Sequence, residues 1–192
     1  MKKETQRTDL NWLVPGRCCL LVIDPQERLM VHIHNADRVA KNISLMIRLA
    51  RVFSLPIVAC TQYKKGIGPI VPEVAGLLEG AACIDKLEFN ALANEKVRTA
   101  LDDLSPDVDT LLVCGVETHI CIYQTGLGAL QACYDVRIVA DGVSSRTPEN
   151  HALGLARLRE AGAVVMPAEM IIYEFLQKAG TEAFKAMLPH LK

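Results

Sequence analysis

Short apolar runs alternate with segments of helical spacing along almost the whole chain, and this alternation is the strongest constraint on the fold. The runs are rich in Val, Ile and Leu, which is typical of strands buried on both faces. They lie at residues 18–24, 56–61, 81–86, 111–113, 136–141 and 163–166. Strands separated in this way predict a three-layer α/β/α domain with a mainly parallel, Rossmann-like sheet of about six strands.

The segments between these runs carry helix signals. Asn35 and Asp37 can cap a helix that extends to Phe53, and Pro148 suits the first turn of a later helix that Gly162 ends. Further helices are predicted at residues 94–104, 120–132, 171–178 and 181–188. Residues 1–16 are expected to form an N-terminal arm, and residues 17–192 one domain, because composition changes nowhere else along the chain.

Composition excludes several classes of function. The 192 residues are 51% hydrophobic and carry a net charge of −1, so no broad attraction to nucleic acid or anionic membrane is expected. The seven cysteines form no Cys-x-x-Cys pair, which favours reduced thiols in a cytoplasmic protein. The N-terminus has no apolar core of a signal peptide, and no apolar run approaches the ~18 residues of a membrane span.

Residues 111–125 read as strand, tight turn and helix. Gly115 interrupts the apolar run, and Thr118 stands where an N-cap would begin a helix, with Cys121 in its first turn. Free N–H groups and the helix dipole favour a thiolate there, and the same groups can receive the oxyanion of an attacked carbonyl. On this stretch alone, Cys121 could equally be a small buried hydrophobe, like most of the other six cysteines.

Three predicted strands end on or near a reactive group, namely Asp24, Lys86 and Cys121. In an open parallel sheet, sites form beyond the carboxyl ends of the strands. A lysine lowers the pKa of a nearby thiol, and a carboxylate can accept the thiol proton and return it to a leaving group. The alternative is that Asp24 and Lys86 are ordinary solvated strand ends, and the residues alone leave this open.

The same residues carry a family resemblance. Ile23-Asp24-Pro25-Gln26, Asp85-Lys86 and residues 115–121 (GVETHIC) together resemble the isochorismatase-like cysteine hydrolase superfamily. The similarity runs in order from about residue 17 to residue 178 and includes residues 140–143 and 162–169. No single piece is specific, but the combination is.

The resemblance implies a role for each residue. Cys121 would be the nucleophile, Asp24 the general base that becomes the acid, and Lys86 the cation that orients Asp24 and favours the thiolate. The Val116–Glu117 bond matches the position of a cis non-proline peptide, and the backbone N–H groups of Glu117 and Cys121 would bind the oxyanion. The resemblance also implies a homo-oligomer (a dimer, a tetramer or larger), a small-molecule substrate and no organic cofactor.

Two departures narrow the expected chemistry to hydrolysis of a small amide. Residues 61–73 lack the Asp-x-His…His cluster of nicotinamidases, so no metal is expected, and they resemble the loop of isochorismatase domain-containing proteins. Cys121 argues against cleavage of the isochorismate vinyl ether, because true isochorismatases lack this cysteine. Two alternatives remain: ether hydrolysis by Asp24 and Lys86 alone, and a non-catalytic binding protein that keeps the fold.

Other polar residues receive plainer interpretations. His32 and His34 have no third metal ligand nearby, and His119 points away from Cys121 if the two share a helix, which favours a structural or pocket-wall role. Cys133 is expected to be partly exposed. Inert core cysteines are predicted at Cys18, Cys19, Cys60, Cys83 and Cys114. The substrate pocket is expected to include Gln26, Leu29, Tyr63, Phe89 and Ile120.

Overall fold

A computed structural model describes residues 12–191 and contains a six-stranded sheet in which every strand pair is parallel. The spatial order of the strands is β3-β2-β1-β4-β5-β6. In chain order they are β1 (Cys18–Ile23), β2 (Ile57–Gln62), β3 (Ala82–Lys86), β4 (Thr110–Val116), β5 (Asp135–Ser144) and β6 (Val164–Met166). The predicted three-layer architecture with a parallel sheet is confirmed.

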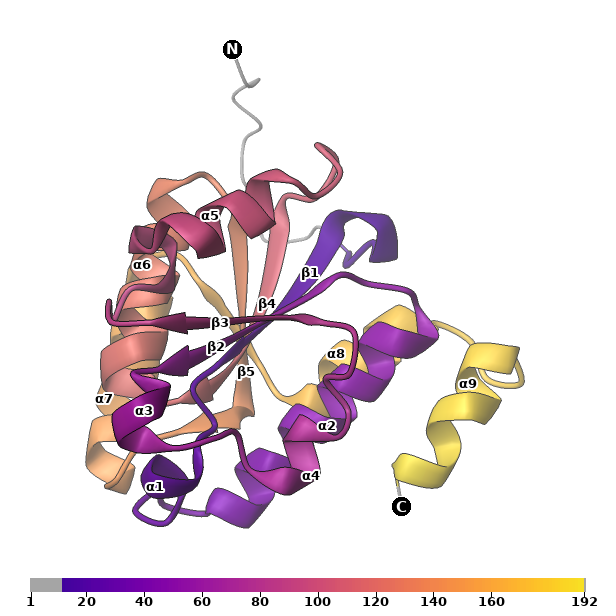
Figure 1. The fold of residues 1–192 in the computed structure, drawn as a ribbon. Coiled ribbons are helices and arrows are strands. Elements are labelled where there is room, and N and C mark those ends of the chain that lie inside the picture. Colours follow the sequence, from indigo (N-terminus) through magenta and orange to yellow (C-terminus); the bar gives the residue numbers. More distant parts are fainter. Residues whose placement is uncertain (1–11, 192) are drawn as a thin grey trace.

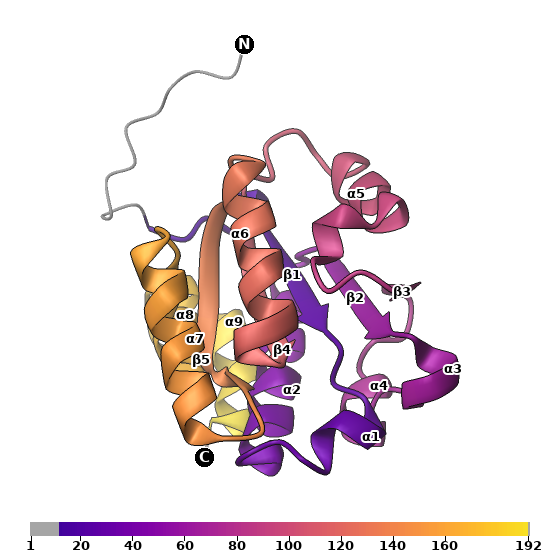
Figure 2. The same ribbon diagram turned by 90° about the vertical axis from the view of Figure 1, so that its left-hand side faces the viewer.

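Helices cover both faces of the sheet (Figures 1 and 2). One layer contains α5 (Glu95–Asp102), α6 (Tyr123–Gln131) and α7 (Pro148–Glu160). The other contains α2 (Ala36–Val52), α8 (Ala168–Leu176) and α9 (Glu182–Met187). Short helices lie in the loops after β1 and β2, namely α1 (Glu27–Met30), α3 (Lys64–Ile67) and α4 (Pro72–Ala75).

The central strand β1 shows how the two cores divide. Leu20 and Val22 pack toward α2 and α8, whereas Cys19 and Leu21 pack toward the layer of α5, α6 and α7. Successive side chains of a strand point to opposite faces, so a strand between two helical layers must be apolar throughout. This requirement explains why the strands appear in the sequence as uninterrupted apolar runs.

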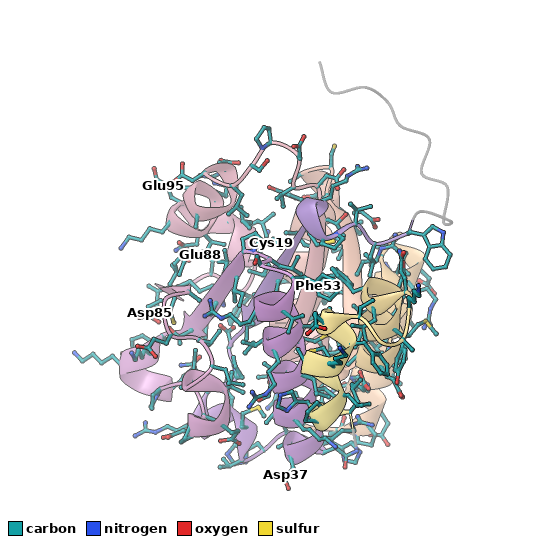
Figure 3. The ribbon with its side chains drawn as sticks, turned by 90° about the vertical axis from the view of Figure 1, so that its right-hand side faces the viewer. Cys19, Asp37, Phe53, Asp85, Glu88 and Glu95 are labelled. Atoms are coloured by element: carbon teal, nitrogen blue, oxygen red, sulfur yellow. The ribbon has the colours of Figure 1, made fainter. Side chains whose placement is uncertain are left out.

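The α2 layer is closed by an aromatic pair. Phe53 follows the last turn of α2, and its ring meets that of Phe175 in α8 edge to face, with centroids 5.3 Å apart and planes at 63°. Figure 3 labels Phe53 at this end of α2, next to the C-terminal helices. Within residues 12–191, none of the helices has the length and apolar character needed to cross a membrane.

The order in which strands are added to the sheet reverses at β1. The chain builds outward from β1 to β2 and β3, then returns to place β4 on the other side of β1. In open α/β sheets, ligands bind beyond the carboxyl ends of the strands at such a switch point. Asp24 follows β1 at this place, and the turn that carries Cys121 follows β4.

The sequence predicted the presence of the strands correctly, but it predicted where the strands and helices begin and end less accurately. All six predicted strands form, but β5 continues beyond the predicted residue 141 to Ser144, and the loop predicted after β2 contains α3. The predicted first turn of an α-helix at Cys121 is wrong, because Thr118–Ile122 forms a π-helical turn that begins after Glu117 and precedes α6. Residues 1–11 of the predicted arm lie outside the described residues, and within its remainder Leu13 is buried.

Gly115 permits the close approach of the two central strands. It pairs with Ile23 of β1 and has φ of +124°, a backbone conformation that favours glycine. A Cβ atom placed on Gly115 would lie 1.9 Å from the carbonyl oxygen of Ile23. The residue before Asp24 and the strand before Cys121 are therefore in backbone contact that only glycine allows.

We predict that Gly115→Ala lowers the free energy of unfolding by at least about 3 kcal/mol, because backbone strain and overlap with Ile23 add. The matched control is Gly80→Ala, because Gly80 also has a positive φ, +75°, but a Cβ atom there would meet nothing within 4 Å beyond its chain neighbours. That change should cost only about 1 kcal/mol. Urea denaturation measures both, and equal losses would contradict the steric argument.

Candidate active site

Asp24 lies at the centre of a buried ion pair. It follows β1 with φ of +54°, and its backbone N–H donates to the carbonyl oxygen of Cys60 at 3.1 Å. Lys86, the last residue of β3, donates from Nζ to Asp24 Oδ2 at 2.7 Å, and neither side chain is exposed to solvent. Because β2 separates β3 from β1, the lysine side chain spans the carboxyl end of β2 to reach the carboxylate.

Gln62, the last residue of β2, is a second partner of Lys86 that the sequence analysis missed. Its Oε1 accepts from Lys86 Nζ at 2.8 Å, and its Nε2 donates to the carbonyl oxygen of Leu87 at 2.7 Å. The ammonium is thus held between a carboxylate and an amide oxygen. The signal was available, because Gln62 is a polar residue at the end of a buried strand, just like Asp24 and Lys86.

Asp85 has a different environment from Lys86, although the two are adjacent. Its Oδ1 accepts from Thr61 Oγ1 at 2.9 Å and from the backbone N–H of Lys64 at 2.8 Å. Successive residues of a strand point to opposite faces, so Asp85 lies at the exposed edge formed by β3 (Figure 3) while Lys86 points inward. Asp85 braces the loop after β2.

The Asp24 carboxylate keeps one oxygen uncommitted. Oδ1 is buried and has no hydrogen-bond partner within residues 12–191. Burial raises the pKa of Asp24, and the charge and hydrogen bond of Lys86 offset this only in part. The Cys121 thiol also faces Asp24 and lowers its pKa. A buried base of raised pKa beside a thiol is the arrangement needed to accept the thiol proton.

Cys121 lies inside the π-helical turn Thr118–Ile122. The residues on either side of it, Ile120 and Ile122, both donate from their backbone N–H groups to the carbonyl oxygen of Glu117, at 3.0 and 3.2 Å. The thiol is nearly buried, with 6% of the residue exposed. Short π-helical segments are rare and often occur at functional sites.

Burial holds Cys121 as the neutral thiol, although Lys86 acts toward the thiolate, in the expected direction. Burial raises the pKa of Cys121 to about 12, and the charge of Asp24 acts in the same direction. Lys86 and the backbone N–H of Glu117 act in the opposite direction but do not prevail. Lys86 is already paired with Asp24, so the pair presents little net positive charge to the thiol.

The peptide bond between Val116 and Glu117 is cis, at the position that the resemblance singled out. The backbone N–H of Glu117 hydrogen-bonds to the Cys121 thiol. The Glu117 carboxylate turns away and pairs with Arg146, whose Nε lies 3.1 Å from Oε2. The backbone of Glu117 therefore faces the Cys121 thiol, and its side chain does not.

The five predicted pocket residues have different environments. Gln26 is fully buried, and its amide is engaged with the loop after β2: Nε2 donates to the carbonyl oxygens of Gln62 and Gly68, and Oε1 accepts from the Gln62 N–H. Leu29 packs against the α2 core, and Ile120 against the α6 core. Tyr63 and Phe89 are about half exposed, at 48% and 51%.

The remaining histidines and cysteines differ in their exposure and hydrogen bonding. His32 and His34 are exposed in the loop before α2, and residues 12–191 contain no cluster of three His, Cys, Asp or Glu side chains arranged to hold a metal. His119 hydrogen-bonds through Nδ1 to Ser145 Oγ at 2.9 Å. The prediction that Cys83 is a core residue is wrong, because β3 is an edge strand and leaves it exposed. Cys133 is exposed.

The chain is similar in sequence to several known proteins. The sequence is 33% identical over 186 residues to the secreted isochorismatase effector Isc1 of Phytophthora sojae, covering 95% of this chain and 88% of that protein. It is 32% identical over 179 residues to isochorismatase domain-containing protein 2 of Bos taurus, covering 93% of this chain and 85% of that protein.

A solved structure of YcaC from Pseudomonas aeruginosa, with hexane-2,5-diol and covalent acrylamide, superimposes with a TM-score of 0.87. The two sequences are 27% identical, and the superposition covers 94% of this chain and 92% of that one. The sequence profile of the isochorismatase domain matches residues 18–170, which include Asp24, Lys86 and Cys121. These sequence matches show that the chain belongs to the isochorismatase family.

Proposed function

We propose that this protein is a cysteine hydrolase that cleaves a small carbonyl substrate, most readily an amide, through a thioester on Cys121. The observation that carries the proposal is the Cys121 thiol facing the buried Asp24 carboxylate, whose Oδ2 is held by Lys86 and whose Oδ1 has no hydrogen-bond partner among residues 12–191. One carboxylate oxygen is fixed and the other is free to accept a proton. This division suits a general base that must act at one defined atom.

The first half-reaction forms the thioester. Asp24 takes the thiol proton as sulfur attacks the carbonyl carbon, and the carbonyl π electrons move to oxygen. The backbone N–H groups of Glu117 and Cys121 stabilise this oxyanion. When the tetrahedral intermediate collapses, the C–N bond breaks and the departing amine takes the proton from Asp24, which restores the carboxylate.

The second half-reaction uses the same groups with water. Asp24 accepts a proton from water as the oxygen attacks the thioester carbonyl, and the same N–H groups stabilise the second oxyanion. The C–S bond then breaks, the thiolate of Cys121 takes the proton back from Asp24, and a carboxylic acid leaves. Throughout, Lys86 keeps Asp24 oriented and offsets its charge when the carboxylate is ionised.

The raised pKa of Cys121 favours this coupled proton transfer over attack by a preformed thiolate. A thiol with a pKa of about 12 is protonated at neutral pH, so the base must act during the attack. The covalent acrylamide in the YcaC structure supports a reactive centre in the family, because acrylamide is an electrophile of the kind that thiols attack and is itself a small amide.

The two alternatives differ in their use of Cys121. Ether hydrolysis of an isochorismate-like substrate needs only the Asp24–Lys86 pair as proton donor, and a binding protein needs none of the three groups. Neither accounts for a cysteine that faces a buried carboxylate. We also propose a homo-oligomer, because exposed apolar residues such as Leu87 and Phe89 follow the strand end that supplies Lys86. The free cysteines favour a cytoplasmic location.

We predict that Cys121→Ala abolishes ammonia release from any small amide that the wild-type protein hydrolyses, because no thioester can form. Asp24→Asn should lower kcat/KM by about 10²- to 10⁴-fold, the usual contribution of a general base. Ammonia release from a panel of small amides measures both. Cys133→Ala, which alters an exposed thiol outside the site, should retain full activity. Ether cleavage that survives Cys121→Ala would support the rival chemistry instead.

The pH dependence provides a second prediction. The wild-type kcat/KM should fall as the pH drops through the raised pKa of Asp24, because the protonated carboxyl cannot accept the thiol proton. Above that pKa the rate should be level until the pH approaches the thiol pKa of about 12. In Asp24→Asn the residual rate should instead rise steadily with pH, because hydroxide must remove the thiol proton. Parallel profiles for the two proteins would refute Asp24 as the base.

A further inference from the structure

Three consecutive residues before the nucleophile are bonded to one distant segment of the chain. Glu117, Thr118 and His119 each hydrogen-bond through their side chains to residues between 145 and 151. This segment contains the connection from β5 to α7 and the first turn of α7. We call residues 145–154 the α7 brace. The proposed reaction does not use any side chain of this segment, so its dense contacts with the cysteine turn require an explanation.

Each contact is short and involves a different partner. Glu117 Oε2 accepts from both the backbone N–H and Nε of Arg146, each at 3.1 Å. Thr118 Oγ1 lies 2.9 Å from His151 Nδ1, and His119 Nδ1 lies 2.9 Å from Ser145 Oγ. The brace is itself anchored, because Ser145 accepts through its carbonyl oxygen from the backbone N–H of His34 at 2.9 Å.

Close packing reinforces these hydrogen bonds. Gly154 is buried against the turn, and a Cβ atom at this position would lie 3.0 Å from the carbonyl carbon of Thr118 and 3.0 Å from the backbone nitrogen of His119. The first two turns of α7 therefore rest directly on the backbone that leads to Cys121. Helices α6 and α7 lie side by side over the sheet in both ribbon views (Figures 1 and 2).

The Thr118–His151 contact differs from the other two in its burial and chemistry. Thr118 is fully buried. It directly follows Glu117 and is the first residue of the turn that contains Cys121. Burial lowers the pKa of His151, and the nearby charge of Arg38 and the His34 ring act in the same direction. A neutral imidazole with its proton on Nε2 can accept a hydrogen bond at Nδ1 from the Thr118 hydroxyl, whereas an imidazolium can only donate hydrogen bonds.

We propose that His151 is a positioning residue for acyl transfer: through Thr118 it fixes the Glu117 N–H relative to the Cys121 sulfur. The inference rests on the proposed function, since it assigns a use to the hydrogen bond only if an oxyanion forms at this turn. An oxyanion donor must point at the place where charge develops, and small misplacements reduce rates strongly. The brace supplies that rigidity from outside the reacting groups.

Two reactions of the same thiol separate this role from a purely structural one. Acetylation by p-nitrophenyl acetate passes through a tetrahedral oxyanion, whereas alkylation by iodoacetamide displaces iodide at saturated carbon and forms none. The first reaction needs the aligned N–H groups, and the second needs only an accessible thiol and its base. A variant that misplaces the donors should slow acetylation selectively.

The experiment compares His151→Leu, His151→Asn and Thr118→Val with the wild-type protein. Release of p-nitrophenol measures acetylation, and mass spectrometry confirms the modification of Cys121 in both reactions. We expect His151→Leu and Thr118→Val to slow acetylation about 10- to 100-fold and to leave alkylation within about twofold. His151→Asn should recover most of the rate, because its Oδ1 can replace Nδ1 as acceptor. His32→Leu, at an exposed histidine outside the brace, is the matched control.

Each other outcome counts against the proposal. Wild-type acetylation in both His151→Leu and Thr118→Val would overturn it, and so would an equal loss of both reactions accompanied by a lower melting temperature, which marks a structural bond. If His151→Leu does not fold, the nearly isosteric Thr118→Val decides alone. If wild-type Cys121 is alkylated but never acetylated, the proposed function fails first, and the positioning role fails with it.

Discussion

The arrangement of the site depends on one buried ion pair, between Lys86 and Asp24. Removing two charges from water costs several kcal/mol each, and the attraction offsets this only with good geometry and further hydrogen bonds. Here Lys86 has both Asp24 Oδ2 and Gln62 Oε1 within 2.8 Å. These three residues end the neighbouring strands β1, β2 and β3, so the order of strands in this half of the sheet brings the partners together.

The pair also determines how the thiol can react. A free lysine beside Cys121 would stabilise a thiolate, but an ion-paired lysine contributes little net charge, and burial then keeps the proton on sulfur. Asp24, with one oxygen bonded to Lys86 and the other without a hydrogen-bond partner among residues 12–191, is the carboxylate that faces this thiol. The chemistry therefore follows from charge neutralisation within the pair rather than from an unusually acidic cysteine.

The sequence predicted what depends on local pattern and missed what depends on contacts across the fold. Apolar runs indicated the strands, and strand ends indicated Asp24 and Lys86, because both signals are contained in a few adjacent residues. The π-helical turn has the same apolar spacing as an α-helix, so residues 118–122 could not be distinguished from one. His151 is 33 residues from Thr118, and only the packing of α7 shows that they meet. The raised pKa of Cys121 could not be predicted from the sequence, because the burial of Cys121 and the pairing of Lys86 with Asp24 depend on the tertiary structure.

In the proposed reaction, the two halves of the sheet supply different groups. The half from β1 to β3 holds the proton acceptor, through Lys86 and Gln62, while the half from β4 to α7 holds the nucleophile and its N–H groups. The halves meet at Gly115, where the absence of a side chain lets β4 contact Ile23 directly. The proposed proton transfer between Asp24 and Cys121 requires that the two strand ends keep a fixed separation. Backbone contact at the switch point holds that separation more firmly than side chains could, because backbone atoms have no rotamers to exchange.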